Sequence, residues 1–222
     1  MRVEWFGQSA FAFDDGDAKV FVDPFADTSA LAGRGLQFDY PAIEAGGVDL
    51  LLVTHEHLDH NGVEAVAGEP ALLRATAGRL DSPLGEVVAI ASEHDDVAGT
   101  KRGPNTIFVF ELGGLRVAHF GDFGQAALRP EQAQAIGEVD LLFVPVGGGP
   151  TLGGTAAAEI ALSLGPAWVV PMHYRTPRID FLETEEEFVA AFSHVERLES
   201  PSFETGDLPR AKGPLAVVPA AP

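Results

Sequence analysis

The chain has 222 residues, 46% of them hydrophobic, so it can bury a core, and we expect a single domain over residues 1–222. Its formal net charge of −19 disfavours a nucleic-acid partner, because nucleic-acid backbones are bound by basic patches. The lack of cysteine excludes disulfides and thiolate metal sites, and no apolar segment reaches the ~20 residues of a membrane span. Since the N-terminus also lacks the apolar region of a signal peptide, we expect a cytoplasmic protein without a membrane partner.

Strands dominate the first half of the chain. Short apolar segments are separated there by glycine and aspartate turns, with a long loop over residues 24–41 and a short helix over residues 61–67. The expected strands lie at residues 3–6, 10–13, 20–23, 48–54, 71–74, 87–91, 106–112 and 115–120, the last two forming a hairpin.

Helices alternate with strands in the second half. We expect helices at residues 130–136, 155–164 and 184–195, the third capped by Thr184 with Glu187 three residues on. The expected strands lie at residues 141–144, 168–170 and 215–218. This order of elements predicts a mixed α/β domain built in layers.

A cluster of polar residues follows the apolar strand at residues 48–54, in the sequence HEHLDH. His55, His57 and Asp59 begin on one side of an extended segment, and a turn can bring His60 beside them. The chain has only seven histidines, so three in six positions is not a chance grouping, and an internal cluster is not an expression tag. Imidazole and carboxylate groups are ligands for zinc and its first-row neighbours. Four such groups exceed what one catalytic metal needs, which indicates two metals in one site.

Three more candidates for metal ligands each come directly after an expected strand. They are His94, Asp122 and His173. Strand ends deliver side chains to one rim of a sheet, so these residues can join the cluster at residues 55–60. The alternative for His94 is a surface histidine beside two aspartates.

The His-x-His-x-Asp-His pattern resembles the signature of the metallo-β-lactamase superfamily. Further segments resemble the small hydrolases of the ascorbate-phosphate lactonase branch, and the resemblance covers the chain from Val3 to about Arg175. The matching segments are residues 7–11, 22–25, 102–106, 121–122, 144–148 and 171–174. The resemblance implies the metallo-β-lactamase fold, a four-layer αββα sandwich with two metals at one end.

The resemblance also implies a division of the ligands between two metals. A first metal would be held by His55, His57 and His94, a second by Asp59, His60 and His173, with Asp122 bridging them. Relatives often carry a histidine where this chain has Gln8. That residue is not a ligand in the family pattern, so the departure concerns substrate contact or the support of a ligand.

Three other polar residues are expected to act indirectly or not at all. Asp23 can orient a ligating imidazole by accepting its second N–H, or it can cap a turn. His119 lies inside a strand, so we expect a structural or supporting role for it. His194 is expected on the surface of the last helix.

The chemistry expected of such a site is hydrolysis. Two divalent ions can share one water and lower its pKa from ~15.7 to ~7, giving a bridging hydroxide that attacks an ester, lactone or phosphoester. Asp59 can contact both metal and nucleophile and carry a proton to the leaving group. Zinc is the favoured ion, while manganese, iron or nickel also suit such ligands.

The expected substrate is a small anionic or ester-like molecule. Asn105, Tyr174 and Arg175 offer hydrogen-bond donors near the ligands in sequence, and the glycine-rich loop at residues 147–151 can cradle a substrate. Two alternatives remain open. A metal-dependent nuclease is disfavoured by the acidic surface, and a non-catalytic metal-binding module is disfavoured by the complete set of ligands.

Overall fold

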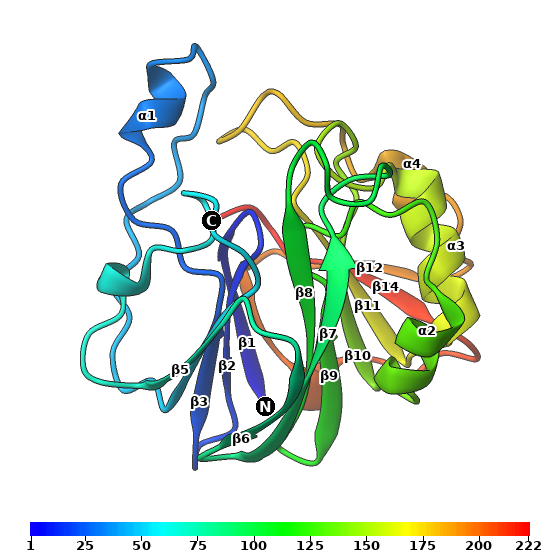
Figure 1. Cartoon of the computed structure of the whole chain (residues 1–222). Helices are drawn as coiled ribbons and strands as arrows, with labels where there is room; N and C mark the ends of the chain where they lie inside the picture. The colour runs from blue at the N-terminus through cyan, green and yellow to red at the C-terminus, as the bar shows by residue number, and fades with distance from the viewer.

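The computed structural model describes the backbone of residues 1–222 and the side chains of residues 1–31 and 33–222. Two β-sheets pack face to face, and helices α2, α3 and α4 cover the outer face of the larger sheet (Figure 1). The outer face of the smaller sheet is covered by short helical turns and loop segments. Residues of those segments, including Phe25, Tyr40 and Ile43, form a separate buried cluster with Phe21 and Leu51 of that sheet. This layering agrees with the expected αββα sandwich.

The smaller sheet has six strands in the order β13-β1-β2-β3-β4-β5. Strands β3, β4 and β5 are parallel to one another, and the pairs from β13 to β3 are antiparallel. The strands are β1 (Arg2–Gly7), β2 (Ala10–Asp14), β3 (Lys19–Val22), β4 (Leu50–Val53), β5 (Ala71–Arg74) and β13 (Ser202–Glu204).

The larger sheet has eight strands in the order β12-β14-β11-β10-β9-β8-β7-β6. Strands β9, β10, β11, β14 and β12 are parallel, and the pairs from β6 to β9 are antiparallel. The strands are β6 (Gly78–Ser82), β7 (Gly85–Glu93), β8 (Pro104–Leu112), β9 (Leu115–His119), β10 (Leu141–Pro145), β11 (Trp168–Met172), β12 (Val195–Arg197) and β14 (Leu215–Val218).

The helices are short and begin and end at recognisable residues. Helix α2 (Pro130–Ile136) opens with proline. Proline lacks a backbone N–H, but N–H groups in the first turn of a helix have no acceptor within the helix, so no hydrogen bond is lost. Helix α3 (Gly154–Leu164) ends at Gly165, whose φ of +63° is a left-handed conformation that glycine adopts without strain. The other helical segments are α1 (Ser29–Ala32), α4 (Glu186–Val189), η1 (Val63–Ala65) and η2 (Thr205–Asp207). Over the described residues, none of the helices has the length and apolar character needed to cross a membrane.

Several expected elements differ from those in the structure. The helix expected over residues 184–195 is reduced to α4, and its N-cap is Glu185, not Thr184. Val195 instead pairs with Ala216 in β12, so the edge of the larger sheet takes the end of that segment. The expected helix over residues 61–67 is a single 3-10 turn, and α1 interrupts the expected loop over residues 24–41. Strands β6, β12 and β13 were not expected.

Phenylalanine rings from the two sheets pack against one another in the core between them. Phe13 from the smaller sheet meets Phe110 and Phe143 of the larger sheet edge to face, with ring centroids 5.4 and 5.1 Å apart. Phe11 lies 4.6 Å from Phe143 by the same measure. Such pairs favour one arrangement of the rings over others, and each of these rings is buried. The interface therefore fixes how the strand ends of one sheet stand relative to those of the other.

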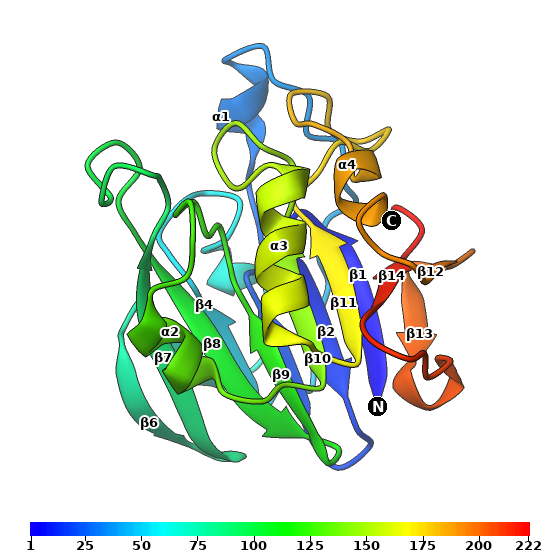
Figure 2. The same ribbon diagram turned by 90° about the vertical axis from the view of Figure 1, so that its right-hand side faces the viewer.

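The ends of strands from both sheets meet at one rim of the sandwich. This rim lies at the top of Figures 1 and 2, where the arm carrying α1, the loop between β7 and β8, and the segment after β11 rise above the sheets. The carboxyl ends of parallel strands point to the same edge of a sheet, so residues that follow them are brought together.

Candidate metal centre

Each of the seven candidate ligands comes at or just after the end of a strand. Four of them follow β4, and the others follow β9 and β11 or lie directly after β7. They are His55, His57, Asp59, His60, His94, Asp122 and His173. Their donor atoms form three overlapping groups, each with atoms within 4.8 Å of one another: a first group of His55, His57 and His94, a second group of Asp59, His60 and His173, and a linking group of His55, His60 and Asp122.

The first group is oriented by a chain of hydrogen bonds that begins at Asp23. The Thr54 hydroxyl donates to Asp23 Oδ2 at 2.7 Å, so its oxygen can accept from His55 Nδ1 at 3.0 Å. That tautomer leaves His55 Nε2 with a lone pair, 3.0 Å from His57 Nδ1. In one neutral tautomer His57 Nδ1 donates to this lone pair, and in the other the lone pairs of both nitrogens face each other, so that a metal ion can bind between them.

His94 is held in the same way from the opposite side. Its Nδ1 donates to the carbonyl oxygen of Pro150 at 3.0 Å, so the neutral form of this imidazole has its lone pair on Nε2. His94 Nε2 lies 3.1 Å from Asp122 Oδ2, and its ring centroid is 4.9 Å from that of both His55 and His57. The three imidazoles therefore surround one point.

The second group is centred on the buried side chain of His60. Its Nδ1 donates to Asp23 Oδ2 at 2.9 Å, and its Nε2 lies 3.2 Å from Asp122 Oδ1 and 3.7 Å from Asp59 Oδ2. His173 Nε2 lies 3.2 Å from Asp122 Oδ2. Within the described residues, His60 Nε2 is buried and has no hydrogen-bond partner. A buried nitrogen that faces two carboxylates without a hydrogen bond fits a metal ligand.

The electrostatics at this rim favour a cation. Burial lowers the pKa of His60, but the carboxylates of Asp122, Asp59 and Asp23 outweigh burial and hold that pKa well above its usual range. Positive charge is therefore stabilised at the His60 ring. A divalent ion at Nε2 supplies such charge in place of a proton.

The imidazoles of the first group have the opposite tendency. Burial, together with neighbouring histidines, holds the pKa of His55 well below its usual range, and burial and His94 lower that of His57. Both rings are consequently neutral near pH 7. Neutral imidazole is the form that binds a metal.

Asp122 stands between the two groups. Burial raises the pKa of its carboxyl, but the imidazoles of His173, His60 and His94 together outweigh burial and hold that pKa well below its usual range. Its backbone N–H donates to Asn105 Oδ1 at 3.0 Å, and the Ser9 hydroxyl donates to its Oδ1 at 3.3 Å. The carboxylate is thus ionised and held in position.

The backbone is strained where it delivers these side chains. Asp23, Gln8 and His173 have φ values of +52°, +49° and +50°, which residues with a Cβ seldom adopt. Gly121, before Asp122, has a φ of +54°, and a Cβ there would lie 2.4 Å from Asn105 Oδ1. Glycine therefore permits the close approach that lets Asn105 reach the backbone of Asp122.

The remaining polar residues take supporting roles. Asp23 accepts hydrogen bonds from His60 and from Thr54, in agreement with the expectation that it orients an imidazole. His119 is fully buried, with Nε2 donating to Ser9 O at 2.9 Å. His194 is exposed but precedes β12 instead of lying on a helix.

Gln8 stands beside the second group. Its Nε2 donates to Asp59 Oδ2 at 3.3 Å, so it supports a candidate ligand. The side chain is fully buried. Gln8 therefore supplies at this position a hydrogen-bonding group that cannot ionise.

The three expected substrate contacts have other positions. Asn105 is buried and its amide donates to Ser92 Oγ and Phe120 O, so it is engaged in holding Asp122. Tyr174 packs against Trp5, with ring centroids 5.4 Å apart, and it lines a different pocket together with Arg175. Nearness to a ligand in sequence did not decide which way these side chains point.

The pocket over the candidate ligands has a volume of about 330 Å³. Besides candidate ligands, it is lined by apolar side chains and by two arginines that the sequence did not single out. They are Leu31, Leu36, Leu58, Phe181, Arg34 and Arg102. Arg102 lies in the segment 102–106, where the sequence predicted a resemblance to the superfamily, whereas Arg34 lies in an expected loop with no motif to mark it.

Comparison with known proteins gives concordant results. Residues 2–173 match the model of the β-lactamase superfamily domain. A UPF0173 metal-dependent hydrolase from Methylobacterium nodulans is 32% identical over 208 residues, covering 78% of this chain and 85% of the relative. A UPF0173 protein from Pyrococcus furiosus is 31% identical over 198 residues, covering 79% and 84%.

A solved structure is similar over the whole chain. It is a candidate Zn-dependent hydrolase of the metallo-β-lactamase superfamily from Thermotoga maritima, with 28% identity and a TM-score of 0.77, covering 100% of this chain and 99% of that one. The similarity to the ascorbate-phosphate lactonase branch stays a prediction.

Proposed function

Since the chain belongs to the metallo-β-lactamase superfamily and is a metal-dependent hydrolase, we propose that it uses two metal ions to hydrolyse a small ester, lactone or phosphoester. The observation that carries this proposal is the position of Asp122. Its Oδ2 lies 3.1 Å from His94 Nε2 in the first group and 3.2 Å from His173 Nε2 in the second. One carboxylate that reaches both sets of ligands suits a pair of ions better than a single one.

The proposed assignment of ligands follows the two groups. His55, His57 and His94 hold one ion, Asp59, His60 and His173 hold the other, and Asp122 is shared. When bound, two divalent ions supply Lewis acidity, which makes a shared water acidic and takes up negative charge at the attacked centre. Zinc suits nitrogen and carboxylate ligands of this kind, and manganese, iron or nickel are the alternatives.

Asp59 is the residue of this set best placed to move a proton. It lines the pocket and its side chain is 19% exposed, whereas those of Asp122 and His60 are buried. Gln8 donates to Asp59 Oδ2, and Oδ1 forms no hydrogen bond with the residues that the structure describes. We assign to Oδ1 the acceptance of a proton from the attacking water and its transfer to the leaving group.

The size of the pocket supports a small substrate. A volume of about 330 Å³ is at the lower end of the ~300–1,000 Å³ of ligand pockets. Binding would remove most of such a molecule from water and strengthen its interactions with the charged groups around it.

His57→Ala tests the proposal with little risk to the fold, because His57 is partly exposed at the pocket. We expect the wild type to carry about two metal ions per chain and the variant about one, measured by elemental analysis after dialysis. Hydrolysis of a panel of esters, lactones and phosphoesters should fall at least ~10³-fold, since several kcal/mol of charge stabilisation are lost.

His194→Ala is the matched control, because it removes an exposed histidine outside the site. It should leave metal content and turnover unchanged. The proposal fails if His57→Ala keeps both ions and full activity, or if the metal-loaded wild type hydrolyses no member of the panel.

A further inference from the structure

Two arginines at the mouth of the metal pocket have no assigned role. Arg34 and Arg102 both line the pocket, and both are exposed. Among the described residues, neither guanidinium forms an ion pair or a side-chain hydrogen bond, although the chain has 33 acidic residues and only 14 basic ones. In so acidic a protein, two uncompensated cations beside one cavity favour an anionic ligand.

Arg102 is fixed in place through its backbone. The loop that follows β7 is organised by Asp95, whose Oδ1 accepts hydrogen bonds from Val97 N at 3.0 Å and Gly99 N at 2.7 Å. Its Oδ2 accepts from Lys101 N at 2.9 Å and Arg102 N at 2.8 Å. The loop next to ligand His94 is therefore closed on one carboxylate, which holds the base of the Arg102 side chain at the pocket.

Arg34 belongs to a compact turn on the opposite side. The carbonyl oxygen of Leu31 accepts from Arg34 N at 2.9 Å and from Leu36 N at 3.1 Å. Gly35, with a φ of +74°, allows the chain to turn back between them. One turn thus presents a cation and two leucines to the same cavity, in the arm that carries α1 (Figure 2).

The acidic groups of the pocket are already engaged. Glu56 lines it, but both of its carboxylate oxygens accept from Arg74 at 2.6 Å. Asp59 and Asp122 face the candidate ligand histidines. The charge left for a substrate at the mouth is consequently positive, next to an apolar wall formed by Leu31, Leu36, Leu58 and Phe181.

We propose that this pocket binds a small amphipathic anion, whose carboxylate or phosphate is held between Arg34 and Arg102 and whose apolar part packs on the leucines and Phe181. Guanidinium groups match both kinds of anion, through paired N–H donors. The inference rests on the proposed function only in taking this anion to be part of the molecule that is hydrolysed.

Equilibrium binding to the metal-loaded protein tests the anion site without turnover. By isothermal titration calorimetry, hexyl phosphate or hexanoate should bind at least ~10-fold more tightly than hexanol, because the anions engage the arginines as well as the metal ions and hexanol is uncharged. The stronger of the two anions identifies the group that the site prefers. Methyl phosphate should bind at least ~10-fold more weakly than hexyl phosphate, because it lacks the apolar chain.

Arg34→Gln and Arg102→Gln should each weaken binding of the preferred anion about 5- to 10-fold, with metal content and hexanol affinity unchanged. Arg175→Gln is the control, since Arg175 is exposed and lines a different pocket. The proposal is overturned if both arginine variants bind the anion as the wild type does, or if the control loses as much affinity.

The two proposals fail in different ways. Anion binding that depends on the arginines, with no hydrolysis of anionic esters, lactones or phosphoesters, removes the proposed function and leaves the anion site. Hydrolysis of small esters, together with anion binding that both arginine variants retain at the wild-type affinity, removes the anion site and leaves the hydrolase.

Discussion

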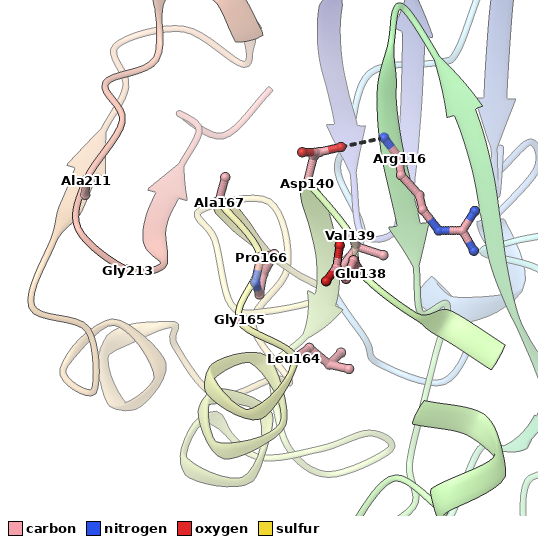
Figure 3. A pocket seen from close by; sticks show the side chains of 10 residues that line it. All are labelled: Arg116, Glu138, Val139, Asp140, Leu164, Gly165, Pro166, Ala167, Ala211 and Gly213. Carbon is pink, nitrogen blue, oxygen red and sulfur yellow. Dashed lines mark hydrogen bonds between the residues drawn. The ribbon is translucent and has the colours of Figure 1, made fainter. Parts of the chain in front are cut away.

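The two ends of the parallel strands β9, β10 and β11 both carry a cavity, and the cavities differ in how their polar groups are satisfied. At the carboxyl ends, His60 Nε2 and His173 Nδ1 are buried without a hydrogen-bond partner in the part of the chain that the structure describes. At the amino ends lies a larger cavity of about 660 Å³ (Figure 3). Its charged side chains include Arg116 and Asp140, which are hydrogen-bonded to the protein itself.

Asp140 ties three strands together at that end. Its Oδ2 accepts from Arg116 N at 2.9 Å, its N–H donates to Arg116 O at 2.9 Å, and its carbonyl accepts from Trp168 N at 3.0 Å. The Arg116 guanidinium donates to Ile136 O at 3.1 Å. Figure 3 shows the bond between Asp140 and Arg116 as a dashed line.

Cavity size alone therefore does not mark the end of the strands that carries the candidate site. The larger cavity has polar groups that are hydrogen-bonded within the fold, whereas buried nitrogen atoms without partners lie at or beside the smaller one, among the residues that the structure describes. Unsatisfied buried nitrogen atoms indicate chemistry, because the fold gains nothing by leaving them unpaired. Variants at the carboxyl ends should therefore affect metal binding, and variants at the amino ends should affect the free energy of unfolding.

Of the variants at the two ends of the strands, Asp23→Asn should have the largest effect, and this effect is on metal affinity. The amide keeps the shape of the side chain, and asparagine tolerates the φ of +52°, but the charge that accepts from His60 Nδ1 is lost. Metal affinity should fall about 10- to 100-fold, as is usual when a group that orients a ligating histidine is changed. Competition with a chelator measures this affinity, and an unchanged value would separate Asp23 from the metal centre.

His119→Gln tests a histidine that lies at the carboxyl end but has partners for both ring nitrogens. Nε2 donates to Ser9 O, and Nδ1 accepts from Gly121 N at 3.2 Å. Burial lowers the pKa of His119 to about 4, below its usual value of 6.5. Between these values the unfolded chain binds a proton that the folded chain does not, so this contribution to stability is complete above pH 6.5 and is lost as the pH falls toward 4.

For metal-free protein, the free energy of unfolding of the wild type should therefore fall by about 2 kcal/mol more than that of His119→Gln between pH 7 and pH 5. Urea titrations at several pH values measure the difference. Metal content at pH 7 should be the same in both proteins. Parallel pH profiles would contradict the assignment of His119 as a neutral packing residue.

Much of the sheet core could be predicted from the sequence, because long apolar strands carry their own signal. The helix over residues 130–136 agrees with α2, and the hairpin of β8 and β9 was expected. Strands β6, β12 and β13 were missed because they are short or mostly exposed edge strands with few apolar residues. Their pairing partners, which lie far away or in a neighbouring strand, decide their conformation.

The candidate site likewise has residues that could be predicted from the sequence and residues that could not. Residues 55–60 and the three positions after strand ends could be selected because their residue types and places in the pattern carry information, although their role as ligands stays a prediction. The orientation of Tyr174 away from the pocket could not be predicted from the sequence, since it depends on packing against Trp5. Arg34 lies in a turn whose position over the site depends on the tertiary structure.

Asp140→Asn is the counterpart of Asp23→Asn at the amino ends and should have the smallest effect. The variant weakens the charge-assisted hydrogen bond that Arg116 N donates to the side chain of residue 140. Because Asp140 is partly exposed, the free energy of unfolding should fall by about 1 kcal/mol or less. Metal affinity and turnover should remain at wild-type values, because Asp140 stands at the opposite end of β10 from the candidate ligands. Loss of metal in Asp140→Asn would show that the two ends are coupled through the strands. Both ends would then affect metal binding, and they would differ only in the size of the effect.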